Sequence, residues 1–308
     1  MKTVVCGYGE VGWTCLDELL RMGADVPLVV THRDDPGERI WFRSVAERAQ
    51  DAGIDVVTFD DVNADEAFQR IAAARPDLIF SFYFRQLLSP RVLALPTAGA
   101  LNMHGSLLPK YRGRAPVNWV LVNGETETGV TLHYMDAKPD HGDIVSQRGV
   151  PIDRDDTALT LTRKIAAAAG DALREAYPLL VAGTGPRRPQ EHRASSYFGG
   201  RKPADGEIDW RSDADSIRNL VRAVTAPWPG AFGFFRGRKL FVWRAETHAL
   251  DDGSPAGEIR LSHAGTPIVA TGAGALELLE VGEEGAHEAG ASWARRSGIV
   301  TGERFDRR

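Results

Sequence analysis

Strand and helix signals alternate through the first half of the chain, and this alternation constrains the fold more than any other feature of the sequence. Short apolar runs are separated by segments whose apolar residues recur at helical spacing. Such an alternation favours a parallel sheet with right-handed crossovers and helices on both faces. We therefore predict a doubly wound, mostly parallel, Rossmann-like α/β sheet. Strands are expected at residues 3–6, 26–31, 56–57, 78–82, 100–102 and 128–135, and helices at residues 10–22, 40–51, 65–74, 117–122 and 157–182.

The pattern changes near residue 200. Residues 183–201 are rich in glycine, proline and basic side chains, which is typical of a linker. Five short strands separated by glycine turns are predicted beyond it, at residues 231–235, 239–243, 257–261, 266–271 and 275–279. Since 308 residues suffice for two domains, we predict a larger domain over residues 1–200 and a small, OB-like β-barrel domain over residues 201–308.

A glycine motif, Gly7-Tyr8-Gly9-Glu10-Val11-Gly12, follows the first strand and matches the pattern of dinucleotide-binding turns. A dinucleotide site also requires an acidic residue near the end of the second strand, and residues 30–32 contain none. Arg33 is placed to meet a phosphorylated ribose. Two interpretations therefore stay open: an NAD(P)-binding oxidoreductase, or a tight turn that needs glycine for its backbone angles.

The segment from residue 101 to residue 143 concentrates the candidate site residues. Asn102 and His104 alternate at the end of a predicted strand, so both side chains point to one side. Ligands of parallel sheets bind outside the carboxyl ends of the strands. A hydrogen-bond donor and a titratable base are thus expected in one pocket, and a carboxylate from the loop 136–143 would orient the imidazole and raise its pKa.

Composition and spacing exclude several classes of protein. A net charge of −5 argues against a polyanion-binding surface over the whole molecule, and no apolar run approaches the roughly 20 residues of a membrane span. The first residues read as a strand rather than a signal peptide, so we expect a cytoplasmic protein without membrane contact. His133, His141, Asp136 and Asp143 lack the spacing of a metal motif, and no metal is expected. Cys6 and Cys15 are predicted to be buried thiols.

An ordered set of residues resembles the signature of the folate-dependent formyltransferases. The resemblance rests on Asn102-x-His104-Gly105-Ser106-Leu107-Leu108-Pro109, Arg112-Gly113-x-x-Pro116, Glu127-Thr128-Gly129-Val130-Thr131 and Asp140-x-Gly142. Within this family, residues 80–83, 107–116 and 118–133 are most similar to enzymes that formylate UDP-4-amino-4-deoxy-L-arabinose. Those enzymes act in lipid A modification, a step of lipopolysaccharide biosynthesis linked to polymyxin resistance.

The resemblance implies a fold, a reaction and a set of site residues. It implies a formyltransferase fold and transfer of a formyl group from 10-formyltetrahydrofolate to the 4-amino group of a UDP-amino sugar, without a metal. Asn102 would donate to the oxyanion, His104 would act as base and then as acid, and Asp140 would hold His104. The residues implied at the folate are Gln86, Leu87, Leu88, Arg114, Asp136, Ala137, Lys138, Pro139 and Asp140.

The sequence also departs from the arabinose enzymes. Three parts of the site loop differ from their more basic loop: Tyr134, residues 136–139 and His141. The chain ends at Arg308 without an NAD-dependent decarboxylase domain. We expect a stand-alone transferase, and a separate UDP-glucuronate decarboxylase chain stays open as a partner. The sugar, the nucleotide and the oligomeric state also stay open.

Charge helps to choose among the acceptors. A methionyl-tRNA formyltransferase should carry a basic second domain, because tRNA is a polyanion. Residues 203–308 contain 13 Lys and Arg against 16 Asp and Glu, a net charge of −3, although Arg295, Arg296, Arg304, Arg307 and Arg308 form a late basic cluster. No nucleic-acid partner is expected. A nucleotide-sugar substrate is favoured, with Arg85, Lys110 or Arg112 as candidate donors to its diphosphate; another amino-sugar nucleotide is the alternative.

Overall fold

The computed structural model describes residues 1–249, 253–283 and 286–306. The chain divides into two compact units. The first comprises residues 1–116, 126–152 and 160–199, and the second comprises residues 117–125, 153–159 and the chain from residue 200 onwards. Arg307 and Arg308 of the late basic cluster lie outside the described residues.

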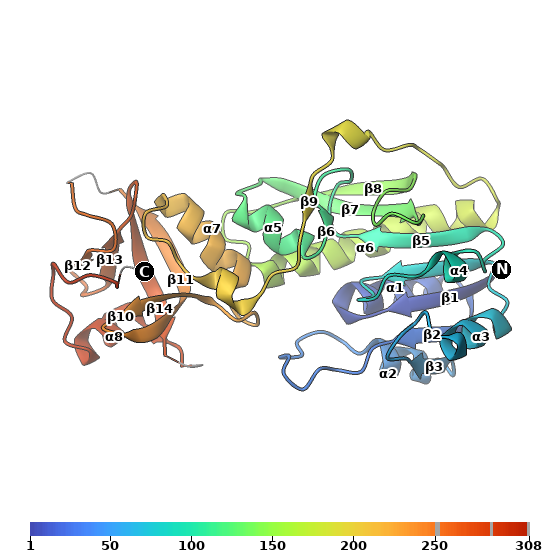
Figure 1. The fold of residues 1–308 in the computed structure, drawn as a ribbon, viewed down its shortest axis with the longest axis horizontal. Helices are drawn as coiled ribbons and strands as arrows, with labels where there is room; N and C mark the ends of the chain where they lie inside the picture. Colours follow the sequence, from blue (N-terminus) through green and yellow to red (C-terminus); the bar gives the residue numbers. More distant parts are fainter. Residues whose placement is uncertain (250–252, 284–285, 307–308) are drawn as a thin grey trace. The chain divides into compact units, whose positions relative to one another are not determined.

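The first unit is built on a seven-stranded sheet in the order β3-β2-β1-β4-β5-β7-β8 (Figure 1). The strands from β3 to β5 pair in parallel, whereas β7 and β8 are antiparallel to their neighbours. The predicted doubly wound, mostly parallel α/β fold is confirmed. The strands are β1 (Lys2–Gly7), β2 (Asp25–Thr31), β3 (Asp55–Thr58), β4 (Leu78–Phe82), β5 (Gly99–His104), β7 (Glu127–Tyr134) and β8 (Ile144–Pro151), and a separate pair joins β6 (Arg112–Gly113) to β9 (Tyr197–Phe198).

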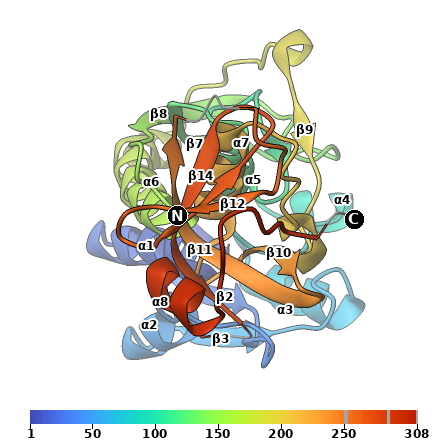
Figure 2. The same cartoon turned by 90° about the vertical axis from the view of Figure 1, so that its left-hand side faces the viewer.

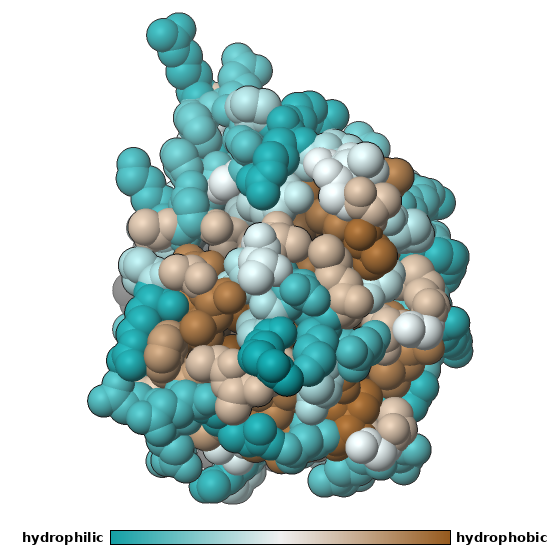
Figure 3. All heavy atoms as spheres, turned by 90° about the vertical axis from the view of Figure 1, so that its right-hand side faces the viewer, coloured by the Kyte–Doolittle hydropathy of each residue, from teal (hydrophilic) through white to brown (hydrophobic). Residues whose placement is uncertain are grey.

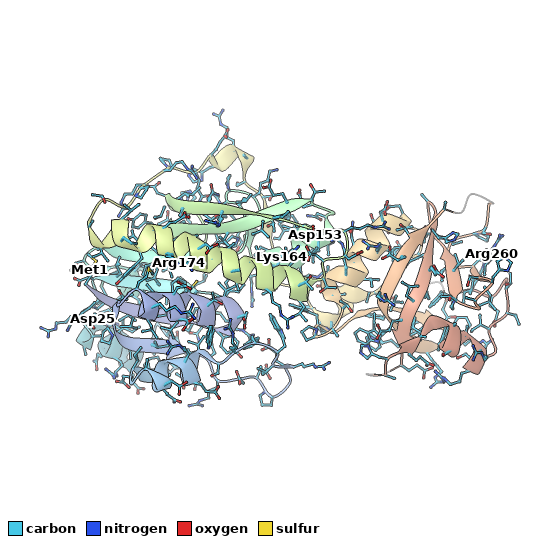
Figure 4. The ribbon with its side chains drawn as sticks, turned by 180° about the vertical axis from the view of Figure 1, so that it is seen from behind. Met1, Asp25, Asp153, Lys164, Arg174 and Arg260 are labelled. Atoms are coloured by element: carbon cyan, nitrogen blue, oxygen red, sulfur yellow. The ribbon has the colours of Figure 1, made fainter. Side chains whose placement is uncertain are left out.

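Helices cover both faces of this sheet. α6 runs along the face seen in Figure 4 and packs against α1, where Gly170 leaves room for the side chains of Thr14 and Glu18. On the other face, Ile71 of α3 and Val92 of α4 join a core cluster with strand residues. The helices up to residue 199 are α1 (Gly9–Arg21), α2 (Val45–Asp51), α3 (Asp65–Ala73), α4 (Pro90–Leu93), α5 (Pro116–Val122), α6 (Ala158–Val181) and the 3-10 turn η1 (His192–Ala194).

Alternation along the central strands explains the two-sided core. Cys6 and Ile79 face the cluster beneath α3 and α4, whereas the ring of Phe80 lies 6.4 Å from that of Tyr177 on α6. Cys6 and Cys15 are both fully buried and unpaired, which confirms the sequence prediction. Burial raises the pKa of the Cys6 thiol to about 12, so the thiol stays protonated at neutral pH.

Two of the differences from the sequence predictions have a local physical reason. The helix predicted to start near Ile40 begins at Val45, because the Ser44 hydroxyl accepts a hydrogen bond from the Glu47 N–H at 3.2 Å and caps it there. Strand β8 was not predicted. Its middle is polar and exposed at the edge of the sheet, so it lacks the continuous apolar run of a buried strand.

The glycine turn after β1 is a close-packed strand-to-helix connection. Gly9 has a backbone φ of +68°, a value that favours glycine. A Cβ atom on Gly12 would lie 3.1 Å from the Phe82 carbonyl oxygen and 3.2 Å from the Val45 side chain. Backbone geometry and packing therefore account for both glycines without a bound dinucleotide.

The second unit holds an antiparallel sheet, drawn in orange to red in Figure 2. Its strand order is β10-β11-β14-β13-β12, with β15 paired to β14. Trp293 on α8 is almost fully buried and its ring contacts Phe235. The expected small β domain is confirmed. Its elements from residue 200 onwards are η2 (Pro203–Gly206), α7 (Ala214–Val224), β10 (Ala231–Phe235), β11 (Arg238–His248), β12 (Ile259–Leu261), β13 (Pro267–Ala270), β14 (Ala275–Gly282), β15 (Glu288–Ala289) and α8 (Gly290–Arg296).

The surface of the first unit shows no broad apolar face from the end that carries the N-terminus. Figure 3 shows several small hydrophobic areas there, separated by hydrophilic side chains. Scattered apolar areas of this kind are normal on protein surfaces. Among the described residues, no helix is both long enough and apolar enough to span a membrane.

Candidate active site

The candidate active site lies at the end of strand β5, which pairs in parallel with β4 and antiparallel with β7. Asn102 and His104 lie two residues apart on β5, so they project to the same face. On β7, His133 pairs with Asn102 and Thr131 pairs with His104. Directly opposed residues of antiparallel strands have Cβ atoms about 5 Å apart. The strand register therefore gathers four polar side chains.

Asp140 completes this group from the loop between β7 and β8. Its Oδ1 lies 3.4 Å from His104 Nδ1 and 3.5 Å from Asn102 Nδ2. Its Oδ2 accepts a hydrogen bond from the Gly113 backbone N–H at 2.8 Å. The structure thus brings together Asn102, His104 and Asp140, the three residues that the sequence singled out for catalysis.

The His104 ring is held by a backbone carbonyl. Its side chain is 6% exposed, and Nε2 lies 2.7 Å from the Tyr111 carbonyl oxygen. A carbonyl oxygen only accepts, so Nε2 carries the hydrogen and Nδ1 is the atom that takes up a proton. We expected Asp140 to raise the pKa of His104. Burial lowers that pKa by more than the Asp140 carboxylate and the Tyr111 carbonyl raise it, so the ring is neutral at pH 7.

Asp140 is strongly acidic despite its burial. Burial alone would raise the pKa of its carboxyl group. The His104 and His133 rings beside the carboxylate and the hydrogen bond from the Gly113 N–H outweigh this effect and lower the pKa to about 2. A permanently ionised carboxylate therefore stands beside the neutral His104 imidazole at neutral pH.

His133, which lies opposite Asn102 on β7, contacts both Asn102 and Asp140. Its Nε2 lies 3.2 Å from Asn102 Nδ2 and 3.7 Å from Asp140 Oδ1. Its Nδ1 lies 2.8 Å from the Tyr134 carbonyl oxygen, and the ring is almost completely buried. His133 is therefore a fixed part of the polar group rather than a mobile surface residue.

The loop after β5 is held by side chains of the neighbouring segments. The Thr131 hydroxyl donates to the Ser106 carbonyl oxygen at 2.7 Å and accepts from the Leu108 N–H at 3.0 Å. A Cβ atom on Gly105 would lie 1.9 Å from the Tyr83 hydroxyl oxygen. Only glycine lets the loop approach the Tyr83 ring this closely.

Strained backbone conformations cluster in the same loops. Left-handed φ angles cost non-glycine residues about 1–3 kcal/mol each and persist only where other contacts impose them. Such strain is typical of functional sites. Four residues of the site loops have φ between +53° and +59°: Tyr83, Tyr111, Ala115 and Asp140.

The three residues implied at the folate ring differ in their surroundings. The Gln86 side chain is bonded locally: its Oε1 accepts from the Val62 N–H at 2.8 Å, and its Nε2 donates to the Asp60 carbonyl oxygen. Leu87 is 70% exposed, whereas Leu88 packs into the core cluster. Of the three, Leu87 offers the accessible apolar surface.

The remaining implied folate residues lie on exposed loops. The Arg114 side chain is exposed, while its backbone N–H donates to the Phe198 carbonyl oxygen at 2.9 Å. Asp136 contacts the His141 ring and accepts from the Lys138 N–H. Ala137, Lys138 and Pro139 are exposed in the same loop as Asp140. Their contact with folate stays a prediction.

Sequence reasoning missed the roles of His133 and Gln190. The alternation of strand residues did place His133 on the same side of the strand as Thr131, but the register with β5 was unknown. Gln190 lies in the segment predicted to be a linker, and no motif marks it. Its buried side chain bonds to both loops of the site.

The candidate metal ligands do not cluster in the part of the chain that the structure describes. Within residues 1–249, 253–283 and 286–306, no three His, Cys, Asp or Glu side chains are grouped to hold a metal ion. Asp136 and His141 form a close pair at 2.9 Å, and the His141 ring stacks on His192 at 4.0 Å. These contacts tie two loops together.

Two family models match the chain, one for each part. The model described as formyl transferase matches residues 1–177. The model described as formyl transferase, C-terminal domain, matches residues 201–298.

Solved structures with similar folds include two N-formyltransferases. The N-formyltransferase from Helicobacter canadensis, solved with folinic acid and dTDP-3-aminofucose, has a TM-score of 0.68 at 20% identity and covers 90% of this chain and 98% of that one. The sugar 3N-formyltransferase WlaRD, solved in the presence of dTDP and 5-N-formyltetrahydrofolate, has a TM-score of 0.70 at 20% identity and covers 93% and 98%. Glycinamide ribonucleotide transformylase 1 from Symbiobacterium toebii is 27% identical, covers 62% and 93%, and has a TM-score of 0.53.

Proposed function

The chain belongs to the formyl transferase family, and on this basis we propose that it transfers a formyl group from 10-formyltetrahydrofolate to the primary amine of a nucleotide-linked sugar. The observation that carries the proposal is the meeting of Asn102, His104 and Asp140 at the end of β5. They supply an amide donor, a neutral imidazole and a carboxylate, the groups that acyl transfer to an amine requires. Similar structures that were solved with formylated folates and with dTDP ligands support both substrates.

His104 is the proposed proton carrier. Nδ1 accepts the proton that the amine releases as it attacks the formyl carbon. The resulting imidazolium lies 3.4 Å from Asp140 Oδ1, whose charge stabilises it. The same proton then passes to the departing folate nitrogen. These two proton transfers require a neutral His104 ring and an ionised Asp140 carboxylate at the start.

Asn102 is the proposed donor to the formyl oxygen as negative charge develops on it. One N–H of its amide is held by His133 at 3.2 Å. The other faces Asp140 at 3.5 Å, which is too long for a strong hydrogen bond, so it remains available to the substrate. A donor of this kind typically contributes about 3–4 kcal/mol to transition-state stabilisation.

The residues around the site suit a formyl donor that is flat and that forms hydrogen bonds. 10-Formyltetrahydrofolate supplies the formyl carbonyl that the amine attacks. Leu87 offers exposed apolar surface in the loop after β4, next to Gln86. In the same loop, the Tyr83 hydroxyl is buried and has no hydrogen-bond partner within the described residues. Gln86, Leu87, Leu88, Arg114 and the loop 136–140 are the residues we propose to hold the folate.

The cations proposed for the diphosphate are not equivalent. Arg112 is buried and donates to Gln190 and His192, so it holds the loop. Arg85 donates to both carboxylate oxygens of Glu38 at 2.7 Å. Lys110 is exposed. Lys110 therefore needs the least rearrangement to meet a phosphate.

The proposed acceptor is UDP-4-amino-4-deoxy-L-arabinose. Its formylation would be a step of lipid A modification, which is linked to polymyxin resistance. Residues 118–133 support this choice, because they resemble the arabinose enzymes almost throughout. A net charge of −3 over residues 203–308 argues against a tRNA acceptor.

Formyl transfer from 10-formyltetrahydrofolate tests the proposal directly. UDP-4-amino-4-deoxy-L-arabinose, a dTDP-linked amino sugar and charged initiator tRNA would be compared as acceptors. We expect turnover with an amino-sugar nucleotide and none with the tRNA. Turnover with the dTDP sugar alone would support the class and contradict the arabinose assignment. Turnover with the tRNA alone would contradict the proposed class of acceptor.

A further inference from the structure

Residues 188–198 form a strap that crosses the loops of the site, although the sequence predicted a linker here. Arg188 and Ile144 exchange two backbone hydrogen bonds, at 2.8 and 3.0 Å. Further along, the Ser196 carbonyl oxygen accepts from the Arg112 N–H at 2.9 Å. The strap is thus attached near both ends to the site: at Arg188 to the strand that follows the Asp140 loop, and at Ser196 to the loop that contains Arg112.

Gln190 is the buried centre of this strap. Its side chain amide Nε2 donates to the Asp140 carbonyl oxygen at 3.0 Å and to the Gly142 carbonyl oxygen at 2.8 Å. Its Oε1 accepts from Arg112 Nη2 at 2.6 Å. The residue is 6% exposed. One carboxamide therefore joins the Asp140 loop to the Arg112 loop and uses both of its N–H groups to do so.

The backbone at Asp140 explains why such support is needed. Asp140 has a left-handed φ of +55°, which a non-glycine residue adopts only when its surroundings impose it. Two residues on, a Cβ atom at Gly142 would lie 2.1 Å from the Tyr134 carbonyl oxygen, so this turn is tightly packed. Gln190 bonds to the carbonyl oxygens on both sides of His141. These bonds hold the turn that aims the Asp140 carboxylate.

We propose that Gln190 is a positioning residue for formyl transfer: its carboxamide fixes the turn at Asp140 so that the carboxylate stays beside His104 and Asn102. The inference rests on the proposed function, although the geometric part can be measured without substrate. Positioning errors of about 1 Å can cost about 10²-fold in rate.

The charges around His104 set the expected pH effect. The groups that face its ring are Asp140, His133, Arg112 and the Tyr111 carbonyl oxygen. Only Asp140 and the carbonyl raise the pKa of His104, whereas Arg112 and His133 lower it. If the carboxylate moves away, burial and the positive charge of Arg112 remain, so the pKa of His104 must fall.

Two variants test the proposal, with a matched control. Gln190→Leu removes all three hydrogen bonds, and Gln190→Glu keeps the acceptor for Arg112 but removes both donors to the turn. We expect kcat to fall about 10- to 100-fold in both, with KM for the folate and the amine changed less than about threefold. Glu191→Gln, exposed and adjacent on the strap, should leave kcat unchanged.

An NMR titration of the His104 ring, without substrate, supplies the second readout. We expect a lower His104 pKa in Gln190→Leu than in the parent protein. If the parent protein formylates no acceptor, a lowered pKa would still support the positioning of Asp140 and would place the failure in the proposed function. A His104 pKa equal to that of the parent protein overturns the proposal. This holds if kcat is normal, and also if kcat falls in parallel with a loss of folding stability. If Gln190→Leu does not fold, Gln190→Glu decides by the same two measurements.

Discussion

Asn102 Nδ2 lies 3.2 Å from His133 Nε2 across the β5–β7 strand pair, and this contact fixes the direction of the Asn102 amide. His133 Nδ1 lies 2.8 Å from the Tyr134 carbonyl oxygen, which can only accept. Nδ1 therefore carries the hydrogen, and Nε2 is an acceptor. The amide must turn its NH₂ group, not its oxygen, toward His133. A backbone carbonyl thus sets the orientation of the proposed oxyanion donor.

Replacing His133 should weaken catalysis mainly through Asn102, which it contacts more closely than Asp140. His133→Leu keeps the bulk but leaves one N–H of Asn102 unheld, so we expect kcat to fall about tenfold or more. In an Asn102→Ala background, the same change should have a much smaller effect, because the interaction with Asn102 is already gone. Steady-state kinetics of the four proteins measure this. Additive losses would contradict the coupling.

The two principal residues should each be needed for turnover. Asn102→Ala should lower kcat by about 10²- to 10³-fold, because one oxyanion donor is lost. His104→Ala should lower it by about 10²- to 10⁴-fold, because the amine loses its proton acceptor. The affinity for the formyl donor, measured by fluorescence titration, should change little. Near-normal turnover in either variant would rule out the assigned role.

Asp140→Asn should move the acid limb of the pH profile to lower pH. Catalysis needs neutral His104, and burial already holds the His104 pKa below its ordinary value. The Asp140 carboxylate raises that pKa, so an uncharged amide must lower it further. The kcat value should also fall, because the imidazolium loses its stabilising charge. The pH dependence of kcat/KM measures the shift, and a shift to higher pH would show that Asp140 does not act on His104 in this way.

Gly105 and Tyr83 should be coupled in stability. Gly105→Ala places a methyl group against the Tyr83 hydroxyl, and we expect a loss of about 1–3 kcal/mol in the free energy of unfolding. Tyr83→Phe removes the hydroxyl oxygen that the new methyl group would contact. In the double variant, it should therefore restore part of the lost stability. Urea denaturation of the single and double variants measures this coupling. An equal loss with and without the hydroxyl would mean that another contact is responsible.

In the second unit, a buried arginine should contribute to stability. Arg218 is 8% exposed; it donates to both carboxylate oxygens of Glu246, at 3.0 and 3.1 Å, and to Asp155. Arg218→Ala removes the buried partner of half-buried Glu246, whose other partner Arg154 is exposed, and we expect a loss of about 1–3 kcal/mol. The exposed pair of Arg211 with Asp209 is the control.

Thermal unfolding of Arg218→Ala and Arg211→Ala compares the two ion pairs. The Arg211 variant should unfold like the parent protein, because water screens exposed pairs. Equal behaviour of the two variants would show that burial of the Arg218 ion pair does not matter.

The sequence alone determined the fold class and the main site residues. The alternation of strands and helices predicted the mostly parallel sheet, because periodicity is a local property of the chain. The motif around Asn102 and His104 identified two proposed catalytic residues, and their position after a strand placed them at its end. The glycines near Gly9 remained ambiguous, because a tight turn and a dinucleotide site use the same residues.

Tertiary structure decided how these residues are held. The pairing of Asn102 with His133 depends on the β5–β7 register, and the bonds of Gln190 to Asp140 depend on packing between segments 50 residues apart. The direction of the His104 pKa depends on the balance between burial and nearby charge, which only three-dimensional neighbours set. Local patterns in the sequence show which residues are present; long-range contacts determine their orientation and protonation.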